Sequence, residues 1–130
     1  MKITLAAPSA KYVIHSYETG QVVINQQPFH KSLVVTPSQL IPDWRPQSME
    51  GLTKEDFSEL MVLEPSIIIL GTGEKQRFPP AVLYSSLLEQ GIGVEIMSTP
   101  AACRTYNLLM AEGRAVAAAL IMIQKAKHQK

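Results

Sequence analysis

The feature that most constrains this chain is a short apolar run, Ser66–Leu70, which lies between Pro65 and the turn residues Gly71-Thr72-Gly73. The run is too short for an ordinary helix, and it contains three consecutive isoleucines. An uninterrupted apolar run of this kind is typical of a strand that is covered on both faces. The chain must therefore supply layers on two sides of a buried strand, which predicts an α/β fold.

The segments on either side of this strand alternate between helix and strand patterns. Thr53 begins a helix, with Asp56 three residues on in a near capping box, and Pro65 ends it. After the apolar run, the expected elements are a helix from Pro79-Pro80 to Gly91, a strand Ile92–Met97, and a helix that Thr99 caps, that begins at Pro100 and that runs to about Ala111.

The segment Ala115–Leu120 is ambiguous. Its alanine-rich composition favours a helix. The preceding Glu112-Gly113 is a stop signal, and Val116 and Ile121 are β-branched, which favours a strand. Propensity alone favours the helix.

The first part of the chain is typical of short strands. Three runs, Tyr12–Tyr17, Gln21–Ile24 and Ser32–Thr36, are separated by turn residues, including Asn25–Pro28. This spacing predicts an antiparallel meander. The proline-rich residues 37–52 are expected to form an irregular connection, with Trp44 as a packing residue. The predicted fold is thus α/β, a small mixed sheet with an N-terminal meander, a βαβαβ second half and flanking helices.

Composition limits the classes of partner. The 130 residues suit one domain, 1–130, with flexible ends at 1–10 and 124–130. The formal net charge is +1, and basic residues cluster only at the end, so nucleic-acid binding is not expected. Apolar runs are too short for a secretory signal or a membrane span, and the single cysteine suits a reducing compartment, so we expect a cytoplasmic protein that is not membrane-embedded.

The second half of the chain contains five ordered segments: Leu70–Gly73, Phe78–Pro80, Gly93–Thr99, Ala102–Leu109 and Glu112–Leu120. Together these segments resemble the Mth-domain family of small uncharacterised proteins. The resemblance covers about residues 12–123. The family includes a mitochondrial assembly factor for respiratory complex I and an adipogenesis-associated cytosolic protein.

The resemblance implies a compact sheet flanked by helices, in which residues 115–123 form a strand, against their propensity. It implies no established enzymatic activity, since the bacterial members of the family are mostly of unknown function, while the mitochondrial member acts through protein partners. The chain begins without an arginine-rich presequence, so it looks like a bacterial or cytosolic member.

The loop Gly71–Glu74 is the first candidate ligand site, because it follows a buried strand as a phosphate-binding loop would. It does not match the dinucleotide fingerprint, since Gln76 stands where a glycine is required, and no Gly-Lys-Ser/Thr follows. The alternative reading is that Gly71-Thr72-Gly73 forms a tight strand exit that needs glycine.

The segment Thr99–Asn107 is the better candidate. N–H groups at the start of a helix can bind an anion, and Arg104 and Asn107 share one helix face. Arg104 could instead pair with an internal carboxylate or lie on the surface. Both loops should meet at the carboxyl edge of the sheet. The candidate ligand-binding residues are Gly71, Thr72, Gly73, Glu74, Ser98, Thr99, Arg104 and Asn107.

No complete catalytic arrangement is recognisable. Cys103 lies near a helix start, which acidifies a thiol, but no histidine can be placed beside it, so a buried structural cysteine is expected. The histidines and the cysteine have no metal-ligand spacing, and no cofactor is expected. The sequence therefore favours a non-enzymatic interaction or assembly module with an unidentified protein partner. The alternative is a small-molecule-binding or anion-binding protein, or an enzyme, that uses a pocket at the carboxyl edge of the sheet.

Overall fold

The computed structural model describes residues 11–124 and contains two sheets. The flexible ends that the sequence predicts at 1–10 and 124–130 lie outside the described residues, apart from Gln124. The smaller sheet is the expected antiparallel meander, and the larger sheet is mixed, with the strand order β6-β5-β9-β7-β8. The strands are β2 Ile14–Glu18, β3 Gln21–Ile24, β4 Gln27–Phe29, β5 Leu33–Val35, β6 Leu40–Ile41, β7 Ile67–Thr72, β8 Gly93–Met97 and β9 Val116–Ile121.

The central strand β7 pairs in parallel with β8 on one side and with β9 on the other, whereas β5 pairs antiparallel with β9 and β6. The predicted α/β class, the parallel second half and the flanking helices are confirmed. The α-helices are α1 Lys54–Ser58, α2 Ser85–Glu89 and α3 Thr99–Ala111, and short 3-10 helices are η2 Met49–Gly51, η3 Glu59–Leu63 and η4 Ala81–Leu83.

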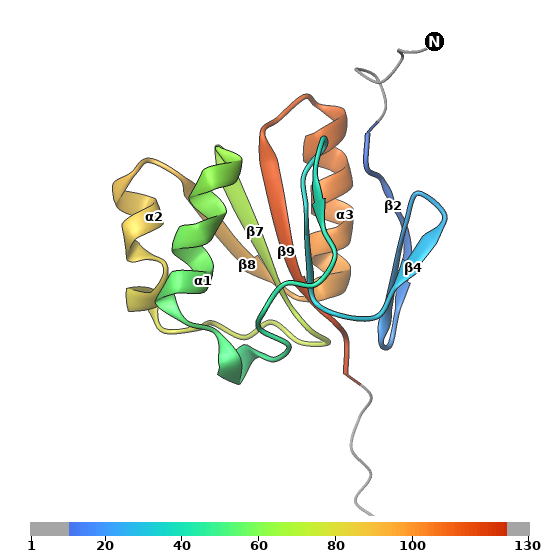
Figure 1. Ribbon diagram of the computed structural model, residues 1–130, viewed down its shortest axis with the longest axis horizontal. Helices are drawn as coiled ribbons and strands as arrows, with labels where there is room; N and C mark the ends of the chain where they lie inside the picture. Colours follow the sequence, from blue (N-terminus) through green and yellow to red (C-terminus); the bar gives the residue numbers. More distant parts are fainter. Residues whose placement is uncertain (1–10, 125–130) are drawn as a thin grey trace, which may run out of the picture.

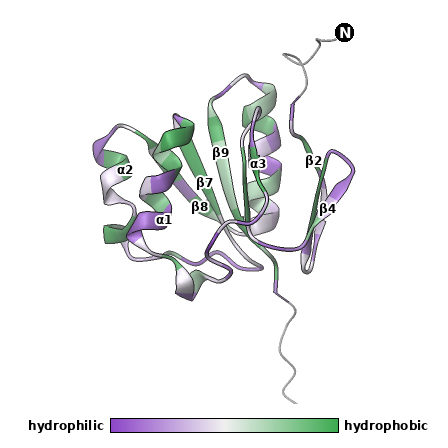
Figure 2. Ribbon diagram, in the orientation of Figure 1, coloured by the Kyte–Doolittle hydropathy of each residue, from purple (hydrophilic) through white to green (hydrophobic). Residues whose placement is uncertain are grey.

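The larger sheet is covered on both faces (Figure 1). The meander and α3 pack on one face, around Tyr106 and Cys103, and α1, η3 and α2 pack on the other, around Phe57 and Trp44. In Figure 2 the central strand β7 is green, the colour of hydrophobic residues, as two-sided burial requires. No helix among residues 11–124 is long and apolar enough to cross a membrane.

The alanine-rich segment forms a strand, β9, so the prediction from propensity is wrong and the one from the family resemblance is confirmed. All six residues of β9 are buried. Alternate residues face the two core clusters, with Ala118 beneath α3 and Ala117 and Ala119 on the α1 side. Small side chains suit a strand that is packed from both sides, and this tertiary environment outweighs a weak intrinsic preference for helix.

The meander differs from the prediction in its third strand. Gln27–Phe29, expected to be mostly turn, forms β4, whereas Leu33–Val35 joins the larger sheet as β5. The turn itself is at Asn25 and Gln26, which adopt positive φ. All three residues of β5 are buried, as a strand inside a covered sheet requires, while β4 is largely exposed.

The helix expected after Pro79-Pro80 is interrupted. The 3-10 turn η4 is followed by Tyr84, whose φ of −124° is not helical, and α2 begins only at Ser85. Gly91 ends this region with a φ of +82°, as expected of a helix stop.

The turn after β7 is a tight strand exit that needs glycine, as the alternative reading expects, but the glycine is not Gly71, which lies inside β7 and does not have positive φ. The reason for glycine here is steric. A Cβ at this position would lie 2.9 Å from both Leu120 Cδ2 and Thr99 Oγ1, and 3.1 Å from Thr99 Cα. Glycine therefore allows the start of α3 to approach the sheet closely. The strand exit with positive φ is Gly73, at +100°.

We expect Gly71→Ala to lower the free energy of unfolding by about 1–3 kcal/mol, because the added methyl group overpacks the contact between β7 and α3. Gly51→Ala is the matched control, since its nearest neighbour would lie at an ordinary 3.7 Å, and it should change stability by less than about 0.5 kcal/mol. Urea denaturation of both variants measures the difference. Equal stability of the two would contradict the steric role of Gly71.

Candidate functional site

The two predicted loops meet at the carboxyl edge of the sheet, as expected. The Gly73 N–H donates to Thr99 Oγ1 at 2.8 Å, and the Thr99 N–H donates to the Gly73 carbonyl at 2.8 Å. Thr99 Oγ1 also donates to the Ile121 carbonyl at 2.6 Å. Thr99 is fully buried, so its hydroxyl joins the ends of β7 and β9 to the start of α3.

The cap of α3 is Ser98, and not Thr99 as the sequence predicts. Ser98 has an extended backbone and its Oγ accepts the Ala101 N–H at 3.4 Å. The Thr99 N–H is used by Gly73, Pro100 has no N–H, and the Ala102 N–H donates to the Ser98 carbonyl. The N–H donors of the first turn are therefore engaged within the protein.

The loop after β7 folds back over the end of β8. Thr72 Oγ1 lies 2.5 Å from the Lys75 carbonyl oxygen and 3.1 Å from that of Met97. The Arg77 N–H donates to the same hydroxyl oxygen at 3.2 Å, and Gln76 Nε2 donates to the Ile96 carbonyl at 2.9 Å. These contacts fix the course of residues 72–77.

A cavity of about 260 Å³ lies on the outer side of this loop. Three predicted site residues, Thr72, Gly73 and Glu74, line it, together with Lys75. Glu50 and Arg77, which form an exposed ion pair of 2.6 Å, also line it. The hydrogen bond from Arg77 holds the pKa of Glu50 below its usual value. Glu50, Lys75 and Arg77 were not among the residues predicted from the sequence. The charged run that follows Gly73 was the available signal for Lys75 and Arg77.

Arg104 and Asn107 do not line this cavity. Arg104 Nη1 donates to the Tyr17 hydroxyl at 2.7 Å. The Asn107 side chain accepts the Ile14 N–H at 3.0 Å and donates to the Ile14 carbonyl at 2.7 Å, so it pairs with the backbone of β2 as a neighbouring strand would. The two residues share one face of α3, as expected, and that face holds the meander. Ligand binding at the eight predicted residues stays a prediction.

Cys103 is fully buried, and burial raises the pKa of its thiol to about 12, with a small opposing effect of Arg104. The helix start does not acidify it enough to offset the lost hydration. No group of three or more metal-ligating side chains occurs among residues 11–124.

We expect Thr99→Val to destabilise the protein by about 2–4 kcal/mol, because it leaves the Gly73 N–H and the Ile121 carbonyl without their buried partner. Thr105→Val makes the same chemical change on α3 at a half-buried position and should be nearly neutral. Thermal and urea unfolding of both variants provide the measurement. A Thr99→Val protein as stable as Thr105→Val would show that the hydroxyl is dispensable.

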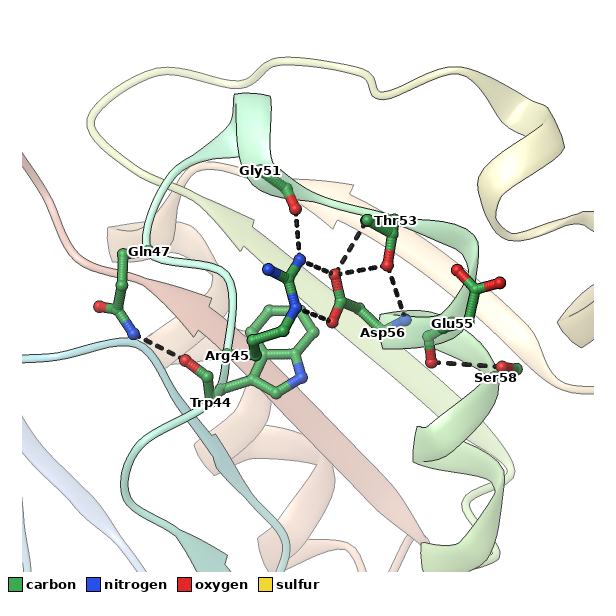
Figure 3. Close-up of polar contacts among 8 residues, drawn as sticks. All are labelled: Trp44, Arg45, Gln47, Gly51, Thr53, Glu55, Asp56 and Ser58. Carbon is green, nitrogen blue, oxygen red and sulfur yellow. Dashed lines mark hydrogen bonds and ion pairs between the residues drawn. The ribbon is translucent and has the colours of Figure 1, made fainter.

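Asp56, in α1, is a buried carboxylate with a structural role (Figure 3). Arg45 donates to it from Nε at 2.9 Å and from Nη2 at 2.6 Å, and Arg45 Nη2 also donates to the Gly51 carbonyl. The Thr53 N–H and hydroxyl donate to Asp56 Oδ2, and Thr53 Oγ1 accepts the Asp56 N–H, which completes the predicted capping box. Burial alone would raise the pKa of Asp56, but the hydrogen bonds from Arg45 and Thr53 hold it below its usual value.

We expect Asp56→Asn to lose about 1–2 kcal/mol of stability at neutral pH, a modest value because Arg45 is 59% exposed. A lowered pKa in the folded state gives stabilisation that is complete above the unfolded pKa of about 4 and is lost as the pH falls through the folded pKa. The gap between wild type and Asp56→Asn should therefore narrow below about pH 4. The control is Glu55→Gln on the exposed side of α1; a gap independent of pH would contradict the assignment.

Comparison with known proteins identifies a matching family. The model of the family described as a protein of unknown function (DUF498/DUF598) matches residues 14–121. Among solved structures, the crystal structure of a Bordetella parapertussis protein is 34% identical, with a TM-score of 0.83, over 88% of this chain and 98% of that one. A Bordetella pertussis structure described as a Mth938-like domain is 26% identical, with a TM-score of 0.80, over the full length of both chains.

Curated relatives carry two kinds of name. The bovine NADH dehydrogenase [ubiquinone] 1 alpha subcomplex assembly factor 3 is 37% identical over 88% of this chain and 62% of its own length. The 13 kDa major membrane protein of Francisella tularensis is 29% identical over 81% of this chain and 86% of its own length. The chain thus spans about three-fifths of the length of the assembly factor that it matches.

Proposed function

The chain belongs to the DUF498/DUF598 family of proteins of unknown function, and we propose that it acts without catalysis, as an interaction module in the assembly of a protein complex. The name of the bovine relative supports this class of function. The expected assembly role, inferred from the family resemblance, points the same way. The chain spans 62% of that relative's length, so the partner of the relative is not assigned to this chain.

The observation that carries the proposal is the internal use of the polar groups at the carboxyl edge of the sheet. Thr99, the first-turn N–H groups of α3 and the Thr72 hydroxyl bond to other parts of the same chain. Arg104 and Asn107 hold the meander, and the Cys103 thiol is buried and protonated at neutral pH. Groups engaged in this way stabilise a scaffold, whereas a catalytic site needs them free to meet a substrate.

Exposed apolar side chains provide a surface to which a protein partner could bind. Six large apolar side chains among residues 11–124 are exposed, and four of them belong to segments that cover the α1 face of the sheet: Val62, Phe78, Val82 and Leu88. Leu108, on α3, lies on the opposite side. Large exposed apolar side chains on this side of the sheet are available for contact with another protein.

Affinity purification of the tagged protein from its native host, with quantitative mass spectrometry, tests the proposal. We expect recovery of subunits of one multi-protein complex. Leu88→Ser should reduce this recovery and Leu108→Ser, of similar exposure, should not. Recovery of no subunits, together with a metabolite that the protein converts, would contradict the proposal.

The cavity beside Glu74 and Lys75 favours a second candidate function, the binding of a small molecule or anion. Lys75 and Arg77 provide positive charge there, although Arg77 is paired with Glu50. A ligand present at a hundred times its dissociation constant should stabilise the fold by about 2.7 kcal/mol. A thermal-shift screen detects this stabilisation, and Lys75→Ala should abolish it if the cavity is the site.

A further inference from the structure

Strand β8 is an edge of the larger sheet and pairs, among the described residues, with β7 alone (Figure 1). The Gly93 N–H donates to the Ser66 carbonyl. In a parallel ladder, alternate residues direct their N–H and C=O groups to the same neighbour. The backbone groups of Gly93, Glu95 and Met97 therefore face β7, and those of Val94 and Ile96 face outward.

A side chain confirms this direction. Gln76 Nε2 donates to the Ile96 carbonyl at 2.9 Å, which places that carbonyl on the outer edge. The remaining outward groups, the N–H and C=O of Val94 and the N–H of Ile96, form a row that an extended chain could pair with. Gln76 thus occupies one of four outward positions.

The two sides of this edge differ in chemistry. Val94 and Ile96 belong to the core cluster on the α1 face, where α2 packs against β8 and Leu88 is half exposed. Glu95 alternates to the other face and is exposed. A strand laid along β8 would therefore place its side chains alternately near apolar groups and near a carboxylate.

We propose that the outer edge of β8 binds an extended segment of a partner protein in which apolar and basic residues alternate. The proposal rests on the proposed function, because it names the kind of segment that an assembly module would hold. A second copy of this chain is disfavoured as the occupant, because full antiparallel overlap of two β8 strands sets Glu95 opposite Glu95.

The test uses a defined peptide, so it does not depend on identifying the partner. The probe is an end-blocked peptide, Lys-Val-Lys-Val-Lys-Val-Lys, and the control is its Glu-Val counterpart. Hydrogen exchange of the Val94 and Ile96 amides is followed by NMR at millimolar peptide. We expect the basic peptide to slow exchange at both amides by about tenfold or more, and the acidic peptide to have no effect. Unchanged exchange with the basic peptide overturns the proposal.

Variants separate main-chain pairing from charge. Val94→Pro removes an outward N–H without removing a bond to β7, a position where an edge strand tolerates proline, and it should abolish protection of Ile96. Val94→Thr keeps the N–H and should behave as wild type. Gln76→Ala frees the Ile96 carbonyl and should strengthen binding, which keeps the proposal testable if the proline variant fails to fold. Glu95→Lys should reverse the preference to the acidic peptide.

Equal protection by both peptides, or protection that survives Val94→Pro in a folded protein, would refute this mode of binding. Such a result leaves the proposed function standing if complex subunits are still recovered from the host. Failure to recover subunits together with conversion of a metabolite, with peptide protection intact, would instead contradict the proposed function and leave the edge as a peptide-binding site.

Discussion

The structure depends on the close approach of α3 to the sheet at Thr99. The missing side chain of Gly71 makes room for it, and the buried hydroxyl of Thr99 bonds to both Gly73 and Ile121. Two parallel strands and one helix are thereby joined through a single group. The same contact fills the place where many open α/β sheets hold a ligand. Stability at this edge and ligand binding at this edge compete for the same donors and acceptors.

Much of the fold follows from local sequence rules. The isoleucine run predicted β7, the Thr53–Asp56 pair predicted the start of α1, and the glycine at 91 predicted a stop. Each of these signals acts within a few residues. The alanine-rich β9 could not be assigned this way, because its strand form depends on two layers that pack on it from distant segments. The third strand of the meander was mispredicted for the same reason. Burial decides that β5 enters the larger sheet and that β4 completes the meander.

The sequence also predicts only part of the candidate site, because strand topology and helical periodicity can be inferred from it and tertiary packing cannot. Topology brings the loops at Gly73 and Thr99 together, and this follows from the parallel pairing of strands. The pairing of Arg104 and Asn107 on one helix face follows from helical periodicity. What that face contacts is a question of tertiary packing, and the sequence does not reveal that β2 crosses it. Glu50 likewise reaches the cavity from an irregular segment whose path no local pattern predicts.

The amide of Asn107 has a consequence for how the molecule opens. It completes the hydrogen bonding of Ile14 in place of a neighbouring strand, so the meander is attached to a helix and not to the larger sheet. Among the described residues, its other polar attachments are single bonds, from Tyr106 to Tyr12, from Tyr12 to Pro37, from Arg104 to Tyr17 and from Gly20 to Ile123. Because no strand ladder joins the meander to the larger sheet among the described residues, opening of the meander would leave that sheet's backbone ladder intact. It would expose Ile14, Val22 and Ile24, which are buried in the core shared with α3 and β9, so the burial of these side chains sets the main free-energy cost of opening.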